Sequence, residues 1–126
     1  MKRIPLLIWI LATLLVSCSD NDKFSSDASA MLDFSIDSLA MDTVFATTST
    51  RTYDFWVYNK GNAGIRIREV RLQHPSQSGF RVNVDGNYID SVAYDFEIRK
   101  EDSIRVFVEL TAPQTEKDTP QRIEDF

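Results

Sequence analysis

The chain has 126 residues, with 19 acidic against 14 basic side chains and a formal net charge of −5. This acidic balance argues against nucleic acid as a partner and against electrostatic adhesion to an anionic lipid surface. The single cysteine excludes an intramolecular disulfide framework.

The chain opens with a short apolar segment that ends close to this cysteine. Two cations, Lys2 and Arg3, precede an apolar run over residues 4–16. A helix needs about 20 residues to cross a bilayer, so this run is too short to span one. It has the length and flanks of a secretory signal instead. The triplet Ala28-Ser29-Ala30 lies beyond a polar stretch and is badly placed for ordinary signal cleavage.

The junction Leu15-Val16-Ser17-Cys18 resembles the cleavage box of bacterial lipoprotein signals. The resemblance implies that residues 1–17 are a helical signal peptide and that Cys18 becomes the lipidated first residue, carrying two or three acyl chains such as palmitate. More than one chain is needed for stable anchoring. The alternative is an incidental thiol at the end of an ordinary signal or a short membrane anchor.

The next residues, Ser19-Asp20-Asn21-Asp22, resemble the acidic tag of Bacteroidota lipoproteins sent to the outer face of the outer membrane. We therefore expect a lipid-anchored outer-membrane protein exposed at the cell surface, with a periplasm-facing lipoprotein or a plain linker start as the alternative. Without residues 1–17 the protein has 109 residues and a net charge of −7, enough for one domain. Residues 18–30 are expected to form the lipidated cysteine and a flexible linker.

Residues 31–113 show the period-two alternation of β-strands. The first two expected strands are residues 32–37 and a short one around Val44 and Phe45. Within 65–72 the inward positions shift by one residue, which predicts a β-bulge. A loop is expected at 75–79, and turns are expected at the polar and glycine-rich segments. The remaining expected strands are 52–58, 65–72, 80–84, a short one at Phe96 and Ile98, and 104–110.

About seven short strands predict an all-β fold, a single antiparallel immunoglobulin-like β-sandwich. The segment DFWVYNKGNAGIRIREVRL, residues 54–72, resembles Hydin-like and major-sperm-protein-like immunoglobulin-type domains. Together with FRVNVDG (80–86) and EDSIRVFVELTAP (101–113), it resembles the N-terminal domain of Bacteroidota surface lipoproteins that continue into a right-handed parallel β-helix. Residues 114–126 show no coil repeats, so they are expected to be a tail, either of a stand-alone module or of a truncated link to a missing domain.

Few side chains indicate a catalytic, metal-binding or modification site. His74 is the only histidine, and an exposed loop histidine is expected. Acids such as Asp33 and Asp85 lack the spacing of a calcium loop and fit turns and strand ends, so no metal or other cofactor is expected. Four Asp-(Ser/Thr)-aliphatic triplets resemble O-glycosylation acceptors of exported Bacteroidota proteins, with Ser38 and Thr43 as the preferred candidates and turn formation as the alternative.

The last candidate is an aromatic patch of Trp56 and Tyr58, with Phe107 alternating in the same way. These side chains either form a binding patch or are covered as part of the structure. We expect a non-enzymatic interaction or spacer module with adhesin-like presentation. Its expected partners are the membrane, through the lipid on Cys18, and a protein or glycan. The alternative is a carbohydrate-binding accessory of a glycan-uptake system.

Overall fold

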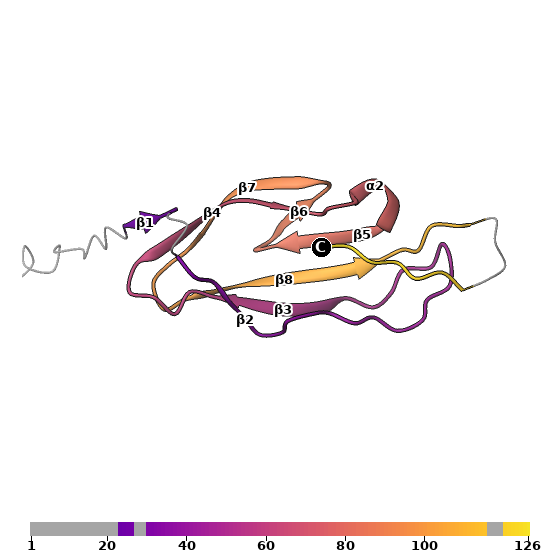
Figure 1. The fold of residues 1–126 in the computed structure, drawn as a ribbon, viewed down its shortest axis with the longest axis horizontal. Coiled ribbons are helices and arrows are strands. Elements are labelled where there is room, and N and C mark those ends of the chain that lie inside the picture. Colours follow the sequence, from indigo (N-terminus) through magenta and orange to yellow (C-terminus); the bar gives the residue numbers. More distant parts are fainter. Residues whose placement is uncertain (1–22, 27–29, 116–119) are drawn as a thin grey trace, which may run out of the picture.

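The computed structural model describes residues 23–26, 30–115 and 120–126. The expected signal peptide, the junction at Leu15-Val16-Ser17 and Cys18 lie outside these residues, as does most of the expected linker. Two β-sheets face each other in the described part, so the expected all-β sandwich is confirmed at the level of its architecture (Figure 1). No helix among the described residues has the length and apolar character needed to cross a bilayer.

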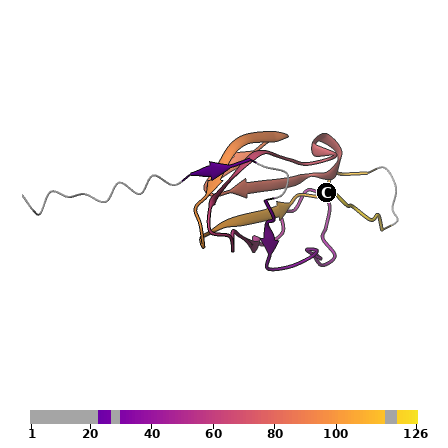
Figure 2. The ribbon, with the colours of Figure 1, turned by 60° about the vertical axis from the view of Figure 1, so that its left-hand side comes forward.

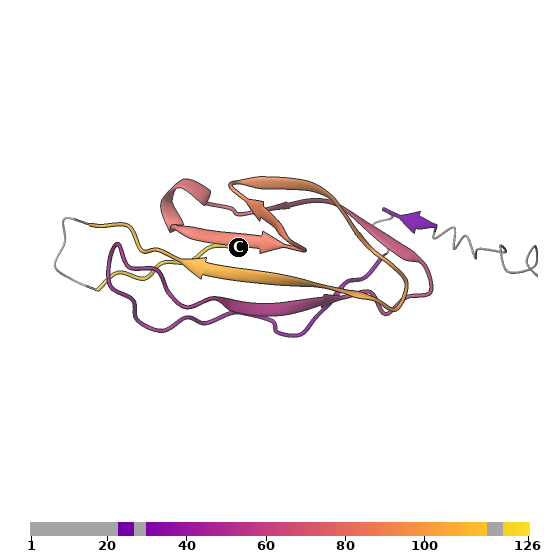
Figure 3. The same cartoon turned by 180° about the vertical axis from the view of Figure 1, so that it is seen from behind.

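The larger sheet has five strands in the order β2-β3-β8-β5-β6. All its neighbouring strands are antiparallel. The long strands β3 and β8 run side by side through it in both broad views (Figures 1 and 3). Its strands are β2 (Asp33–Phe34), β3 (Tyr53–Tyr58), β8 (Ser103–Leu110), β5 (Phe80–Val84) and β6 (Asn87–Ile89).

The smaller sheet has the order β1-β4-β7, comprising β1 (Phe24–Ser25), β4 (Gly64–Arg71) and β7 (Val92–Ile98). The pair β1–β4 is parallel, so the expectation of a wholly antiparallel sandwich is wrong at this edge. Residues 18–30 were expected to form a flexible linker, and the described residues 23–26 of this stretch contain β1, which pairs with β4 at one end of the domain (Figures 1 and 2).

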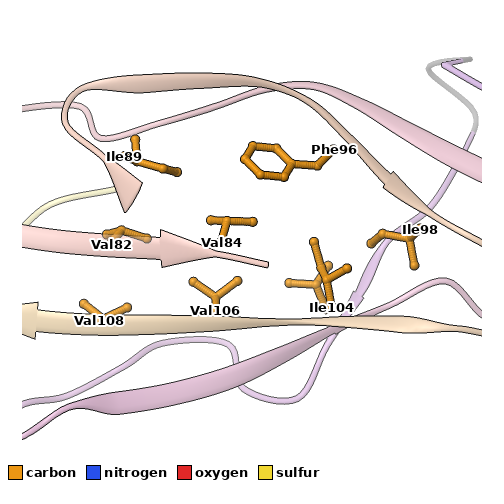
Figure 4. Close-up of a cluster of buried hydrophobic side chains, with 9 residues drawn as sticks. Val82, Val84, Ile89, Phe96, Ile98, Ile104, Val106 and Val108 are labelled. Atoms are coloured by element: carbon orange, nitrogen blue, oxygen red, sulfur yellow. The ribbon is translucent and has the colours of Figure 1, made fainter. Parts of the chain in front are cut away.

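The core lies between the two sheets, where alternate side chains of facing strands meet. Figure 4 shows Phe96 and Ile98 of β7 above Val84 of β5 and Ile104 of β8. Burying such branched side chains contributes about 1.5–3 kcal/mol each, which is the main source of stability in a domain of this size. Branched residues also suit the pleated surface of a strand.

The phase change predicted within β4 is present, but it is not a β-bulge. The register with β7 skips Arg68 and Asp95 but keeps the same offset from Ile65 opposite Ile98 to Arg71 opposite Val92, so neither strand contains an extra residue. Instead both strands break their alternation at the same level, where Asp95 has a left-handed backbone (φ 62°). The two strands therefore shift their inward faces together.

Other expectations need correction. No strand forms around Val44 and Phe45, and Phe45 is 83% exposed. This segment instead joins the end of β8 through single hydrogen bonds, such as that from the Thr47 N–H to the Ala112 carbonyl.

The expected loop at 75–79 contains a one-turn helix, α2 (Pro75–Ser78). Strand β6 was not predicted; it completes a hairpin with β5 across the turn at Asp85-Gly86.

Candidate functional site

The outer face of the larger sheet carries the aromatic side chains singled out in the sequence. Trp56, Tyr58 and Phe107 all point away from the core, because they alternate with buried residues on β3 and β8. Trp56 is only 37% exposed, and Tyr58 is half-buried. The guanidinium of Arg105 lies 5.2 Å from the Trp56 ring centroid and 5.0 Å from that of Phe107.

Cations therefore cover the predicted Trp56–Tyr58 patch in part. Arg105 also donates a hydrogen bond to Asp54 at 2.9 Å, which holds its guanidinium between the two rings. The ammonium of Lys60 lies 5.8 Å from the Tyr58 ring centroid. Such cation–π contacts contribute about 0.5–1 kcal/mol at exposed sites. The structure thus places the two aromatics on one face and partly covers each of them with a cation.

A shallow groove lies beside this patch, on the same face. It has a volume of about 300 Å³ and opens to solvent. Strands β8, β5 and β6 supply most of its wall. Its lining residues are Thr52, Arg81, Asn83, Gly86, Tyr88, Phe107 and Glu109.

The wall of the groove is a cross-strand row of three side chains. Asn83 of β5 pairs with Tyr88 of β6 on one side and with Phe107 of β8 on the other. Tyr88 is 74% exposed. The Asn83 Oδ1 atom is buried and has no hydrogen-bond partner among the described residues. A buried acceptor without a partner is uncommon in folded proteins and needs an explanation.

A fixed ion pair closes one end of the groove. Arg81 donates to Glu109 at 2.8 Å and also to the hydroxyls of Thr111 and Ser49. The hydroxyl of Thr52 donates to the other carboxylate oxygen of Glu109. The hydrogen bonds from Thr52 and then Arg81 lower the pKa of Glu109 below its ordinary value. Arg81 and Glu109 therefore present opposite charges that compensate each other.

A second cluster gathers His74, Ser78 and Asp125, the residue types of a hydrolytic triad. The His74 Nδ1 atom lies 4.0 Å from an Asp125 carboxylate oxygen. Ser78 is only 3% exposed, and its hydroxyl has no hydrogen bond to His74. A triad requires an accessible hydroxyl bonded to the histidine, so this geometry does not form one.

Asp125 has a structural role in that cluster. Its carboxylate accepts hydrogen bonds from the backbone N–H groups of Gln73, His74 and Phe126. Burial raises the pKa of this carboxyl, but the nearby Ser78 hydroxyl and these N–H groups lower it by more. The net effect is a pKa below the ordinary value. The carboxylate thus fastens the last residues of the chain to the turn before α2.

The other predicted residues are scattered. Ser38 and Thr43 are exposed in the irregular segment between β2 and β3, so both are accessible. Asp33 forms an ion pair with Lys60. Among the described residues, no three acidic, histidine or cysteine side chains gather to form a metal site. No protein-family model, curated protein or solved structure matches this chain.

Of the groove's lining residues the sequence singled out only Phe107, and strand β6, which supplies Tyr88, was not predicted. Tyr88 lies in no alternating apolar run and so gave no strand signal. The dipeptide Asp85-Gly86 was a usable signal, since Asp-Gly is typical of a two-residue hairpin turn. Both residues have positive φ, at 48° and 84°. That hairpin brings Tyr88 opposite Asn83.

Proposed function

We propose that this protein is a lipid-anchored outer-membrane protein whose immunoglobulin-type β-sandwich presents a binding face, without catalysis, at the cell surface. The observation that carries the proposal is the junction Leu15-Val16-Ser17-Cys18 directly before a polar segment and a β-sandwich. The likeness to Hydin-like domains supports the immunoglobulin-type assignment. The open outer face of the larger sheet supports presentation, since binding sites lie on surfaces that a rigid scaffold holds in place.

The anchor can be tested by replacing its acceptor. In cells given an alkyne-labelled palmitate, the wild-type protein should carry label and sediment with the outer membrane. Cys18→Ser should lose the label and leave the membrane fraction, because no acyl chain then holds it. Ser19→Ala, next to the junction, serves as the matched control and should behave as wild type. Label or membrane association that persists in Cys18→Ser would contradict the proposal.

A second candidate function is that of a carbohydrate-binding accessory protein. The observation that favours it is the groove at Tyr88 and Phe107, which combines aromatic and polar walls. Small-ligand sites typically join apolar or aromatic surface with a few placed polar groups. Arg105 lies over Phe107 as it does over Trp56, so the open aromatic side chain that favours the groove is Tyr88, which is 74% exposed.

A further inference from the structure

We propose that the groove between β8, β5 and β6 binds a neutral sugar unit of an oligosaccharide. This inference rests on the second candidate function and gives it a location and a ligand class. The groove holds about 300 Å³, at the lower end of the range for small-molecule sites. A groove of this size suits a single ring-sized unit.

The spacing of the walls fits a flat ring. Tyr88 and Phe107 belong to the same cross-strand row, with Asn83 between them. Neighbouring strands lie about 4.8 Å apart, so the two aromatic positions are separated by roughly 10 Å. Tyr88 is 74% exposed and free to lie against a ligand. The C–H faces of a sugar ring are apolar and can pack on aromatic surface, while its hydroxyls point outward from the ring edge.

The Asn83 amide, which lies between the two aromatic positions, has hydrogen-bonding capacity that a ligand could use. Asn83 Oδ1 is buried and has no hydrogen-bond partner among the described residues. Leaving such a group unsatisfied costs about 1–3 kcal/mol. An amide that turns about its Cβ–Cγ bond presents its oxygen and its NH₂ group in turn. A sugar hydroxyl, which both donates and accepts, can satisfy either end of the amide.

The charges of the groove favour a neutral ligand. Arg81 is occupied by Glu109, Thr111 and Ser49, and Glu109 by Arg81 and Thr52. Neither side chain has an uncompensated charge to offer to a phosphate, a carboxylate or a cation. Their remaining hydrogen-bonding capacity is held in a fixed direction, which suits recognition of ring hydroxyls. A peptide strand added along the edge of β6 would instead be recognised through its backbone.

The test is binding of the full-length protein, in detergent micelles, to an array of neutral gluco-, xylo-, manno- and N-acetylglucosamine oligosaccharides. Sulfated and uronic-acid oligosaccharides are included for comparison. We expect binding to at least one neutral oligosaccharide, and the best binder is then titrated against the variants. Tyr88→Ala and Asn83→Leu should each weaken binding at least tenfold, because the first removes a wall and the second the amide. Tyr94→Ala, an exposed tyrosine (62%) on the smaller sheet, is the matched control and should bind as wild type.

Several outcomes would overturn the inference: silence across all neutral oligosaccharides, binding confined to charged ones, or full binding by Tyr88→Ala. Capture of an extended peptide instead of a sugar would also overturn it. Circular dichroism of each variant shows whether its fold is intact, and the exposure of Tyr88 makes an unfolded Tyr88→Ala unexpected. Because Cys18→Ser should keep sugar binding while it loses the membrane, failure of the groove and failure of the anchor are distinguishable.

Discussion

At the scale of single residues, Asn59 joins the two turns at one end of the sandwich. It is 1% exposed, and its amide nitrogen donates to the carbonyls of Ala63, Ile98 and Arg99. Its Oδ1 atom accepts from the Gly61 N–H at 2.9 Å. One buried side chain thus shapes the β3–β4 turn and ties it to the end of β7. This amide is fully satisfied, whereas that of Asn83 on the outer face is not.

Asn59→Ala should therefore destabilise the domain strongly. The substitution removes several hydrogen bonds and leaves buried carbonyls without a donor, which costs about 2–4 kcal/mol in total. The measurement is the urea midpoint of unfolding, followed by tryptophan fluorescence. Asn62→Ala, an exposed asparagine of the same turn, is the matched control and should stay within about 0.5 kcal/mol of wild type. Equal midpoints for the two variants would show that the buried amide has no structural role.

At the scale of elements, the C-terminal segment is held by the sandwich and does not extend freely from it. Figure 3 shows the end of the molecule opposite β1, where the yellow C-terminal chain and the segment before β3 approach β5 and β8. The Gln73 N–H donates to the Phe126 carbonyl at 3.0 Å, in addition to its bond with Asp125. Residues expected to be only a tail thus contribute hydrogen bonds to the domain.

Asp125→Asn should destabilise this attachment in a pH-dependent way. The pKa of Asp125 in the folded protein lies below its ordinary value of 3.8. Its charged form therefore adds stability that is fully present above about pH 4 and is lost as the pH falls through the folded-state pKa. The variant should lose about 1–2 kcal/mol at pH 7 in urea unfolding, and the difference from wild type should shrink toward pH 3.

The exposed neighbour Glu124 provides the control for this experiment, since its carboxylate pairs only with Arg122 among the described ion pairs. Glu124→Gln should unfold like wild type at every pH. A gap between wild type and Asp125→Asn that stays constant or widens in acid would contradict the assignment of the effect to the carboxylate.

The elements that the sequence predicted well are those with strong alternation and a buried face. β8 follows its predicted pattern residue by residue, with Ile104, Val106, Val108 and Leu110 buried. Short edge elements were missed or overextended, because two or three residues carry too little periodicity. The run at 32–37 shortens to Asp33–Phe34, and Phe34 is 50% exposed.

The site was harder to predict than the fold. Its residues come from three separate stretches of the chain, and only strand register brings them together. Arg81 and Glu109 lie 28 positions apart in the chain and form a pair across β5 and β8. Likewise, nothing in the sequence places Asp125 beside His74, 51 positions away. Local patterns indicate strands, whereas a site depends on the pairing of those strands.

At the scale of the whole molecule, β1 sets the end of the sandwich from which the chain leads toward the proposed anchor. The Gly64 N–H donates to the Lys23 carbonyl at 3.1 Å, and a Cβ at Gly64 would lie 2.6 Å from the ring of Phe24. Glycine at this position therefore lets the Phe24 ring lie flat on the start of β4. Only five Cα–Cα steps separate Cys18 from Lys23, a reach of at most about 18 Å.

A fluorophore should therefore sense the bilayer differently at the two ends of β3. We expect a probe on Asn62→Cys, in vesicles containing nitroxide-labelled lipid headgroups, to be quenched more strongly than one on Thr48→Cys. The two positions flank a strand of six residues, about 20 Å long. Adding Gly64→Val should displace Phe24, release β1 and reduce the difference. Equal quenching of both probes in the protein with Gly64 would contradict a fixed orientation.

The hydrogen bond between Lys23 and Gly64 thus holds the segment that contains β1 against the sandwich. A long free tether would let a surface protein tumble and sample every direction, so that each of its faces met the membrane as often as the medium. With the proposed lipid on Cys18, attachment at the start of β4 would instead stand the sandwich on one end, with the turns around Asn59 toward the lipid and the opposite end toward the exterior. In that proposed orientation the sides of the sandwich, including the groove, would face along the membrane plane, toward neighbouring molecules on the same cell.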